Sequence, residues 1–97
     1  MKAMLLTQAA NVATALSKID PDDAVELVLN GVAFGTPFKA LEAIPFGFKI
    51  CAKPMRKGQD VIKYGHVIGR ASCDIAVGSL VHVHNIEGCR GRGDLNQ

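Results

Sequence analysis

Ile44-Pro45-Phe46-Gly47-Phe48-Lys49-Ile50 carries a pattern, apolar-x-x-Gly-x-x-apolar, that recurs along this 97-residue chain. Gly reaches the left-handed backbone conformation that a tight turn requires, and Asp tolerates it. Each copy therefore predicts a buried apolar residue, a turn and then a strand. The uneven spacing of the copies excludes a solenoid and predicts a compact fold of short β-ribbons. The other copies are Met55…Gly58…Val61, Ile75…Gly78…Val81 and, with Asp in place of Gly, Ile19…Asp22…Val25.

Three further regions have the composition of strands. Val25–Leu29 runs into Asn30-Gly31, a strong signal for a two-residue hairpin turn, with Val32–Phe34 as the returning strand. Val61–Tyr64 and Leu80–His84 are rich in β-branched residues, and each follows a Gly turn. We therefore expect a mainly β fold with little helix.

The composition limits the function classes that this chain can belong to. It is 48% hydrophobic and 21% charged with a net charge of +2, as expected for one globular domain. That charge is too small to indicate nucleic-acid binding. Three widely spaced cysteines exclude a Cys-x-x-Cys motif and argue against a disulfide framework. With no apolar run of signal-peptide or membrane-span length, we expect a cytoplasmic protein that binds neither nucleic acid nor membrane.

The sequence His82-Val83-His84 predicts two imidazoles on one face of a strand, because alternate side chains share a face. Val81 and Val83 would then face the core. Two imidazoles at this spacing suit a divalent metal, given a third ligand from elsewhere. They equally suit carboxylate binding or proton transfer, and the plainest alternative is a solvent-facing strand edge with two ordinary histidines. The remaining histidine of the chain is His66, in a Gly-flanked turn.

Two other segments carry polar chemistry. Lys63-Tyr64-Gly65 ends a predicted strand, where the Lys can meet a substrate carboxylate and the Tyr can donate a hydrogen bond or act as a general acid. The alternative is a Lys that extends along the surface to water and a half-buried Tyr. Gly88–Asp94 contains Arg90 and Arg92, whose guanidiniums suit carboxylates. The pattern alone, however, favours a disordered terminus there.

Several of these segments together resemble the small SAF domain of altronate and galactarate dehydratases, and the similar small subunit of sulfolactate sulfo-lyase. The resemblance covers nearly the whole chain, and its most specific part is the combination of Lys-Tyr-Gly with His-Val-His-Asn. Asn11–Leu16, which periodicity leaves open between helix and strand, is similar to the family's opening strand. The segments that carry the resemblance are Ile44–Ile50, Val61–Ala71, Asp74–Gly78, Val81–Glu87 and Gly91–Asp94.

The resemblance implies a β-clip, SAF-like fold over residues 1–86, followed by a flexible Gly- and Arg-rich arm over residues 87–97. In the family this domain works with a large catalytic domain or subunit to remove water from a sugar acid. A divalent metal, iron or manganese, serves the assembled enzyme, and we expect no tight metal binding by this domain alone. The resemblance therefore implies the small subunit, or the N-terminal domain, of a hydro-lyase, and we expect it to be inactive without its large partner.

The implied reaction gives roles to individual residues. His82 and His84 are expected to transfer a proton or to ligate the metal, and Tyr64 is expected to donate to a hydroxyl. The substrate-binding residues are expected to be Lys63, Arg70, Asn85, Arg90 and Arg92.

One position departs from the family. Where the family usually has Gly-His-Lys, this chain has Gly47-Phe48-Lys49, and a Phe can neither ligate a metal nor transfer a proton. Either the substrate differs, or the chain is a degenerate or regulatory relative. The rival hypothesis is a non-catalytic SAF-type module that binds a carbohydrate or a protein. A third possibility is self-association, in which a second copy covers the surface meant for the large partner.

Overall fold

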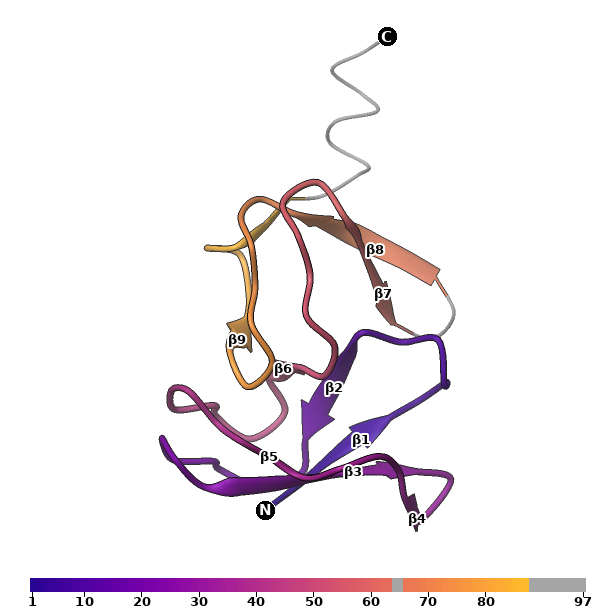
Figure 1. Cartoon of the computed structure of the whole chain (residues 1–97), viewed down its shortest axis with the longest axis vertical. Coiled ribbons are helices and arrows are strands. Elements are labelled where there is room, and N and C mark those ends of the chain that lie inside the picture. The colour runs from indigo at the N-terminus through magenta and orange to yellow at the C-terminus, as the bar shows by residue number, and fades with distance from the viewer. Residues whose placement is uncertain (64–65, 88–97) are drawn as a thin grey trace, which may run out of the picture.

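The computed structural model describes residues 1–63 and 66–87, which form ten strands in two sheets and no helix (Figure 1). The larger sheet has the order β4-β3-β1-β2-β6-β9 with β5 paired to β3, and the smaller sheet has the order β10-β8-β7. The predicted mainly β fold of short ribbons is confirmed. The strands are β1 (Lys2–Leu5), β2 (Val12–Ala15), β3 (Ala24–Leu29), β4 (Val32–Ala33), β5 (Phe38–Lys39), β6 (Lys49–Cys51), β7 (Asp60–Lys63), β8 (His66–Ala71), β9 (Leu80–Val81) and β10 (Ile86–Glu87).

All four copies of the repeated pattern form the predicted turn. The central residue of each copy has a positive φ: 70° at Asp22, 83° at Gly47, 87° at Gly58 and 94° at Gly78. The two apolar residues of every copy are at most 4% exposed. Each turn is closed by a hydrogen bond, such as that from the Phe48 N–H to the Pro45 carbonyl at 3.0 Å. A positive φ at the third residue alone is the mark of a type II turn.

The copies associate in two reciprocal pairs, which the sequence pattern did not predict. Ile19 and Ile44 each donate an N–H to the other's carbonyl, at 2.9 and 2.8 Å, and Met55 and Ile75 do the same at 2.9 and 2.8 Å. Each turn N–H also donates to a small residue that precedes the partner copy by four positions. These bonds are Asp22 to Ala40 (2.8 Å), Gly47 to Ala15 (2.9 Å), Gly58 to Ala71 (2.7 Å) and Gly78 to Cys51 (3.0 Å).

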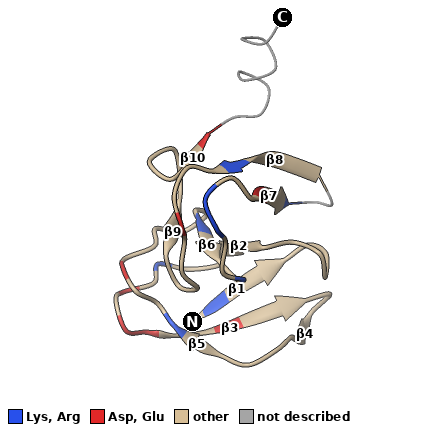
Figure 2. Ribbon diagram, turned by 45° about the horizontal axis from the view of Figure 1, so that its top comes forward, with Lys and Arg blue, Asp and Glu red and all other residues tan. Residues whose placement is uncertain are grey.

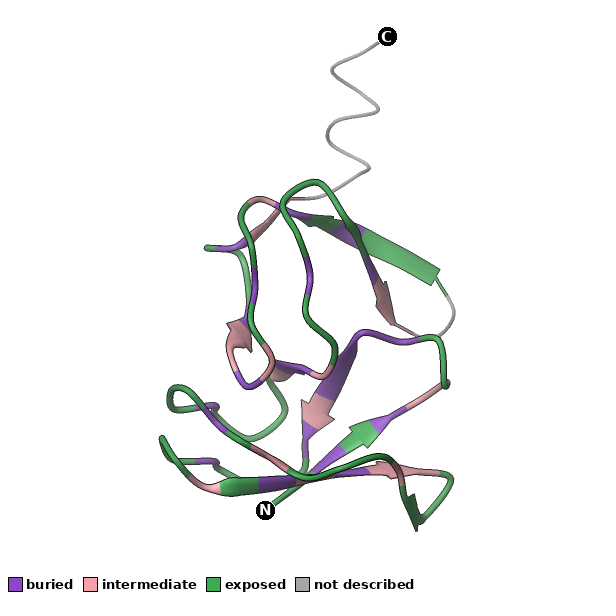
Figure 3. Ribbon diagram, viewed as in Figure 1, coloured by how far each residue is buried: buried purple, intermediate pink, exposed green. Residues whose placement is uncertain are grey.

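Each pair of copies builds its own hydrophobic core (Figure 3). The first core contains Ile19 and Ile44, and the second contains Met55 and Ile75. Strands β2, β6 and β9 lie between the cores, because successive strand residues point to opposite faces. On these strands Ala13, Ile50 and Leu80 pack in the first core, whereas Val12, Cys51 and Val81 pack in the second.

Asn11 connects the larger sheet to the smaller sheet, and Gly78 brings the Met55–Ile75 pair of copies against residues 39–41. Asn11 is 4% exposed, and its side chain donates to the Asp60 carbonyl at 2.9 Å and accepts from the Ile62 N–H at 2.7 Å. It thereby ties β2 to β7. The Gly78 carbonyl accepts the Leu41 N–H at 2.9 Å, and a Cβ added to Gly78 would overlap the Lys39 carbonyl oxygen.

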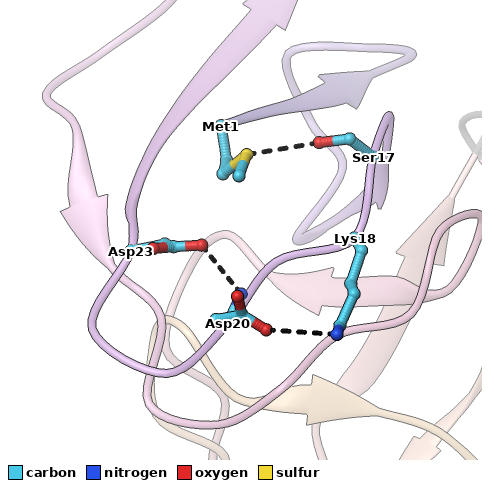
Figure 4. Close-up of polar contacts among 5 residues, drawn as sticks. All are labelled: Met1, Ser17, Lys18, Asp20 and Asp23. Atoms are coloured by element: carbon cyan, nitrogen blue, oxygen red, sulfur yellow. Dashed lines mark hydrogen bonds and ion pairs between the residues drawn. The ribbon is translucent and has the colours of Figure 1, made fainter.

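The hairpin and the opening strand agree with the sequence. Asn30 and Gly31 have φ values of 53° and 78°, as a type I′ turn requires, and they join β3 to β4 in antiparallel register. Residues 12–15 form strand β2 and not a helix. Figure 4 shows how the first turn is held: the Asp23 carboxylate accepts the Asp20 N–H at 2.8 Å.

One predicted strand is wrong in its extent. Leu80–His84 was expected to be a strand, but β9 ends at Val81, and the Asn85 N–H donates to the His82 carbonyl at 3.0 Å to form a turn. His82 and His84 therefore do not share a strand face. Val83 is 78% exposed and does not face the core, although Val81 is buried as predicted. The predicted arm, apart from Glu87, lies outside the described residues.

Candidate functional site

The turn after β9 presents both predicted histidines to solvent. Asn85, which is 6% exposed, accepts the His82 N–H at 3.0 Å and donates to the Leu80 carbonyl at 2.8 Å. A buried amide needs such partners, and these bonds fix the backbone on both sides of Val81. His82 and His84 are both exposed. Asn85 is thus a positioning residue in the described structure, and its expected contact with substrate stays a prediction.

Phe48 and His82 lie side by side at the end of the β6–β9 pair. Lys49 pairs with Val81 in antiparallel register, so the next position sets Phe48 opposite His82. Their ring centroids are 5.1 Å apart with the ring planes at 43°. Sequence reasoning singled out both segments but had no signal that they meet, because their contact depends on a pairing between distant strands. The residue that departs from the family therefore contacts a predicted catalytic histidine.

Two of the predicted substrate-binding cations, Lys63 and Arg70, lie on the smaller sheet. Lys63 and His66 pair at the tip of the β7–β8 hairpin. The Arg70 Nε lies 3.7 Å from the Asp60 carboxylate, and both side chains are about half exposed, so this ion pair is weak. Both sheets carry basic as well as acidic residues (Figure 2). Tyr64, Arg90 and Arg92 lie outside the described residues, so the structure does not show where they lie relative to His82.

With this geometry established, comparison with known proteins identifies the family. Residues 1–88 match the altronate/galactarate dehydratase SAF domain. The chain belongs to this family. The SAF domain is 35% identical over 75 residues to altronate dehydratase of Bacillus subtilis and 37% identical over 75 residues to that of Escherichia coli. It is 35% identical over 82 residues to the (2R)-sulfolactate sulfo-lyase subunit alpha of Chromohalobacter salexigens. Each match covers 70% of this chain.

The share of each relative's length that the match covers differs between the two kinds of enzyme. The match spans 15% of each altronate dehydratase but 87% of the sulfo-lyase subunit alpha. The relatives are thus lyases or lyase subunits, and the name of the sulfo-lyase chain marks it as part of a multi-subunit enzyme. Among the described residues, no helix of this SAF domain is long and apolar enough to cross a membrane.

The described residues of the SAF domain do not fit a divalent metal by themselves. Within residues 1–63 and 66–87, no three His, Cys, Asp or Glu side chains lie close enough to share an ion. His82 and His84 supply two donors, whereas protein sites for a catalytic metal usually supply three. The expectation that this domain does not hold metal tightly alone stays a prediction, since a partner or the undescribed residues can add ligands.

Cys51 is a buried structural thiol. Burial raises its pKa to about 11, against a smaller opposing effect of a backbone hydrogen bond at Lys53. The protonated Sγ also donates to the Lys53 carbonyl at 2.9 Å. The thiol therefore stays protonated near neutral pH, and a protonated thiol is a poor nucleophile. Cys73 is exposed, and Cys89 lies outside the described residues. Cys51 behaves as a small core residue.

Proposed function

We propose that this SAF domain is the small subunit, or N-terminal domain, of a sugar-acid dehydratase-type carbon–oxygen lyase whose site is completed by a large catalytic subunit. The supporting observation is the turn held by Asn85, which presents the His82 and His84 side chains to solvent at an open edge. The relatives support the same assignment, because altronate dehydratases extend far beyond the matched region. Because the two histidines are open to solvent, we expect catalysis to need a partner that encloses the substrate.

The reaction removes a proton next to a carboxylate and a hydroxyl from the neighbouring carbon. An imidazole has a nitrogen that can accept a proton and give it back, so His82 or His84 is suited to accept or return that proton. Tyr64 is assigned to donate to the departing hydroxyl. The cations of Lys63, Arg70, Arg90 and Arg92, with the Asn85 amide, are assigned to the carboxylate. A metal ion at this site would need ligands from beyond the described residues, which supply too few of their own.

The test is co-expression of this chain with the large dehydratase-domain protein of the same genome, followed by assay of aldonic and aldaric acids with iron or manganese. Turnover should require both chains and should be lost in His82→Ala and in His84→Ala. Val32→Ala, on the distant strand β4, is the matched control because Val32 is also exposed. A stable complex without turnover, or no complex, would contradict the proposal.

The second candidate is a non-catalytic SAF-type module that binds a carbohydrate or protein. Phe46 and Val83 favour it, because they are 71% and 78% exposed beside the Phe48–His82 pair in sequence. Such side chains are typical of surfaces that a partner covers. A stable complex that binds without turnover would support this candidate. A homo-oligomer of the isolated domain would support self-association through the same surface.

A further inference from the structure

Phe48 is held in place beside His82 by its own backbone. Its N–H donates to the Pro45 carbonyl at 3.0 Å, and its carbonyl accepts the Ala15 N–H at 2.9 Å. The residue remains 37% exposed while its ring contacts the imidazole. One side of the candidate site is therefore an aromatic residue on a hydrogen-bonded backbone, which solvent, and hence a ligand, can reach.

An aromatic ring at this point discriminates between hydroxylated and alkyl groups. A phenyl ring offers a hydroxyl no conventional hydrogen-bond partner. A sugar hydroxyl placed against the ring therefore loses its hydrogen bonds to water and gains none in return. An alkyl group placed there loses no hydrogen bonds, and its transfer out of water is favourable. Once the large subunit encloses this surface, we expect it to discriminate as hydrophobic pockets do, by about 10- to 200-fold. Phe46 and Val83, both exposed, extend the apolar character along the two segments.

We infer that Phe48 sets the substrate class of this site, which takes 2,3-dihydroxy acids with an alkyl remainder in preference to fully hydroxylated sugar acids. The inference rests on the proposed function, because it assumes that His82 contacts the substrate. It concerns the carbons beyond C3, which lie against Phe48 while His82 acts near the reacting carbons.

The reaction is the elimination of one water. The C2 proton is removed, the C2–H electron pair forms the C2=C3 double bond, and the C3–O bond breaks. The departing hydroxide takes up a proton and leaves as water. The resulting enol becomes a 2-oxo acid when C3 gains a proton and the C2 hydroxyl loses one, and no oxidant or reductant is required.

The test compares pentonic acid with 2,3-dihydroxypentanoic acid of the same stereochemistry, using the complex with the large subunit and measuring 2-oxo acid formation. We expect the ratio of kcat/KM values to favour the alkyl acid by about tenfold or more. Phe48→His should shift the ratio towards pentonic acid by about tenfold or more, whereas Phe48→Leu should retain the preference. Because both kcat/KM values are measured on the same variant, a smaller fraction of folded or assembled protein lowers them equally and leaves their ratio unchanged.

The outcomes separate the inference from the proposed function. If the complex turns over neither acid, the proposed function fails and the inference fails with it. If the complex turns over acids but does not prefer the alkyl acid, or if Phe48→His leaves the ratio unchanged, the inference alone is overturned. A preference that Phe48→His reverses and Phe48→Leu keeps would establish Phe48 as a specificity residue.

Discussion

Substitution of Gly78 by Ala tests how closely the turn at Gly78 packs against residues 39–41. Gly58 is the matched control, because it holds the same position of the repeat with a similar φ of 87°, and a Cβ there has nothing within 4 Å. Gly58→Ala should cost about 1–2 kcal/mol, the price of a left-handed Ala. At Gly78 the added Cβ also overlaps the Lys39 carbonyl oxygen and lies 3.2 Å from the Leu41 nitrogen.

Both neighbours of that Cβ are backbone atoms, which cannot rotate away. Overpacking of this kind costs about 1–3 kcal/mol more, so Gly78→Ala should lose about 2–5 kcal/mol in all. Because 1 kcal/mol shifts Tm by about 4–8 °C in a domain of this size, Gly78→Ala should melt about 4–24 °C below Gly58→Ala. Urea unfolding of both variants, followed by circular dichroism, measures the difference. Equal losses in the two variants would refute the close approach of Gly78 to residues 39–41.

Three other predictions follow from contacts in the domain. Asn11→Ala should lower the free energy of unfolding by about 2–4 kcal/mol in urea titration, because two β7 backbone groups lose their partner. Between pH 9 and about 11 stability should fall, because the unfolded Cys51 thiol ionises at its ordinary pKa of 9.0 while the folded thiol keeps its proton; Cys51→Ala should remove that part of the loss. Phe46→Ser and Val83→Ser should weaken large-subunit binding in calorimetry by about tenfold, whereas Val32→Ser, equally exposed, should not.

Local turn chemistry was readable from the sequence. The four turn residues and Asn30-Gly31 all adopt the predicted left-handed conformations, because few residue types tolerate a positive φ. Which copies of the repeated pattern pair with each other could not be predicted from the sequence. All four copies share one local pattern, so nothing in it specifies that Ile19 pairs with Ile44 and Met55 with Ile75. That choice depends on which two copies can enclose a core together.

The candidate site was predicted less well than the fold. The alternation in residues 80–84 favours a strand, but the Asn85 side chain hydrogen-bonds the backbone of His82 and Leu80 and ends the strand early. Such side-chain bonds compete with sheet pairing, and alternation alone does not reveal them. The contact between Phe48 and His82 depends on the β6–β9 pairing, which a single sequence does not disclose.

The sheet shared between the two cores has a consequence for how the domain unfolds. Strands β2, β6 and β9 supply side chains to both cores on alternate faces. If these strands unfold, both cores therefore lose part of their packing at the same time. The two reciprocal pairs of turns do not make two independently melting units. The shared strands instead couple them into one cooperative transition, in which every spectroscopic probe should report the same midpoint.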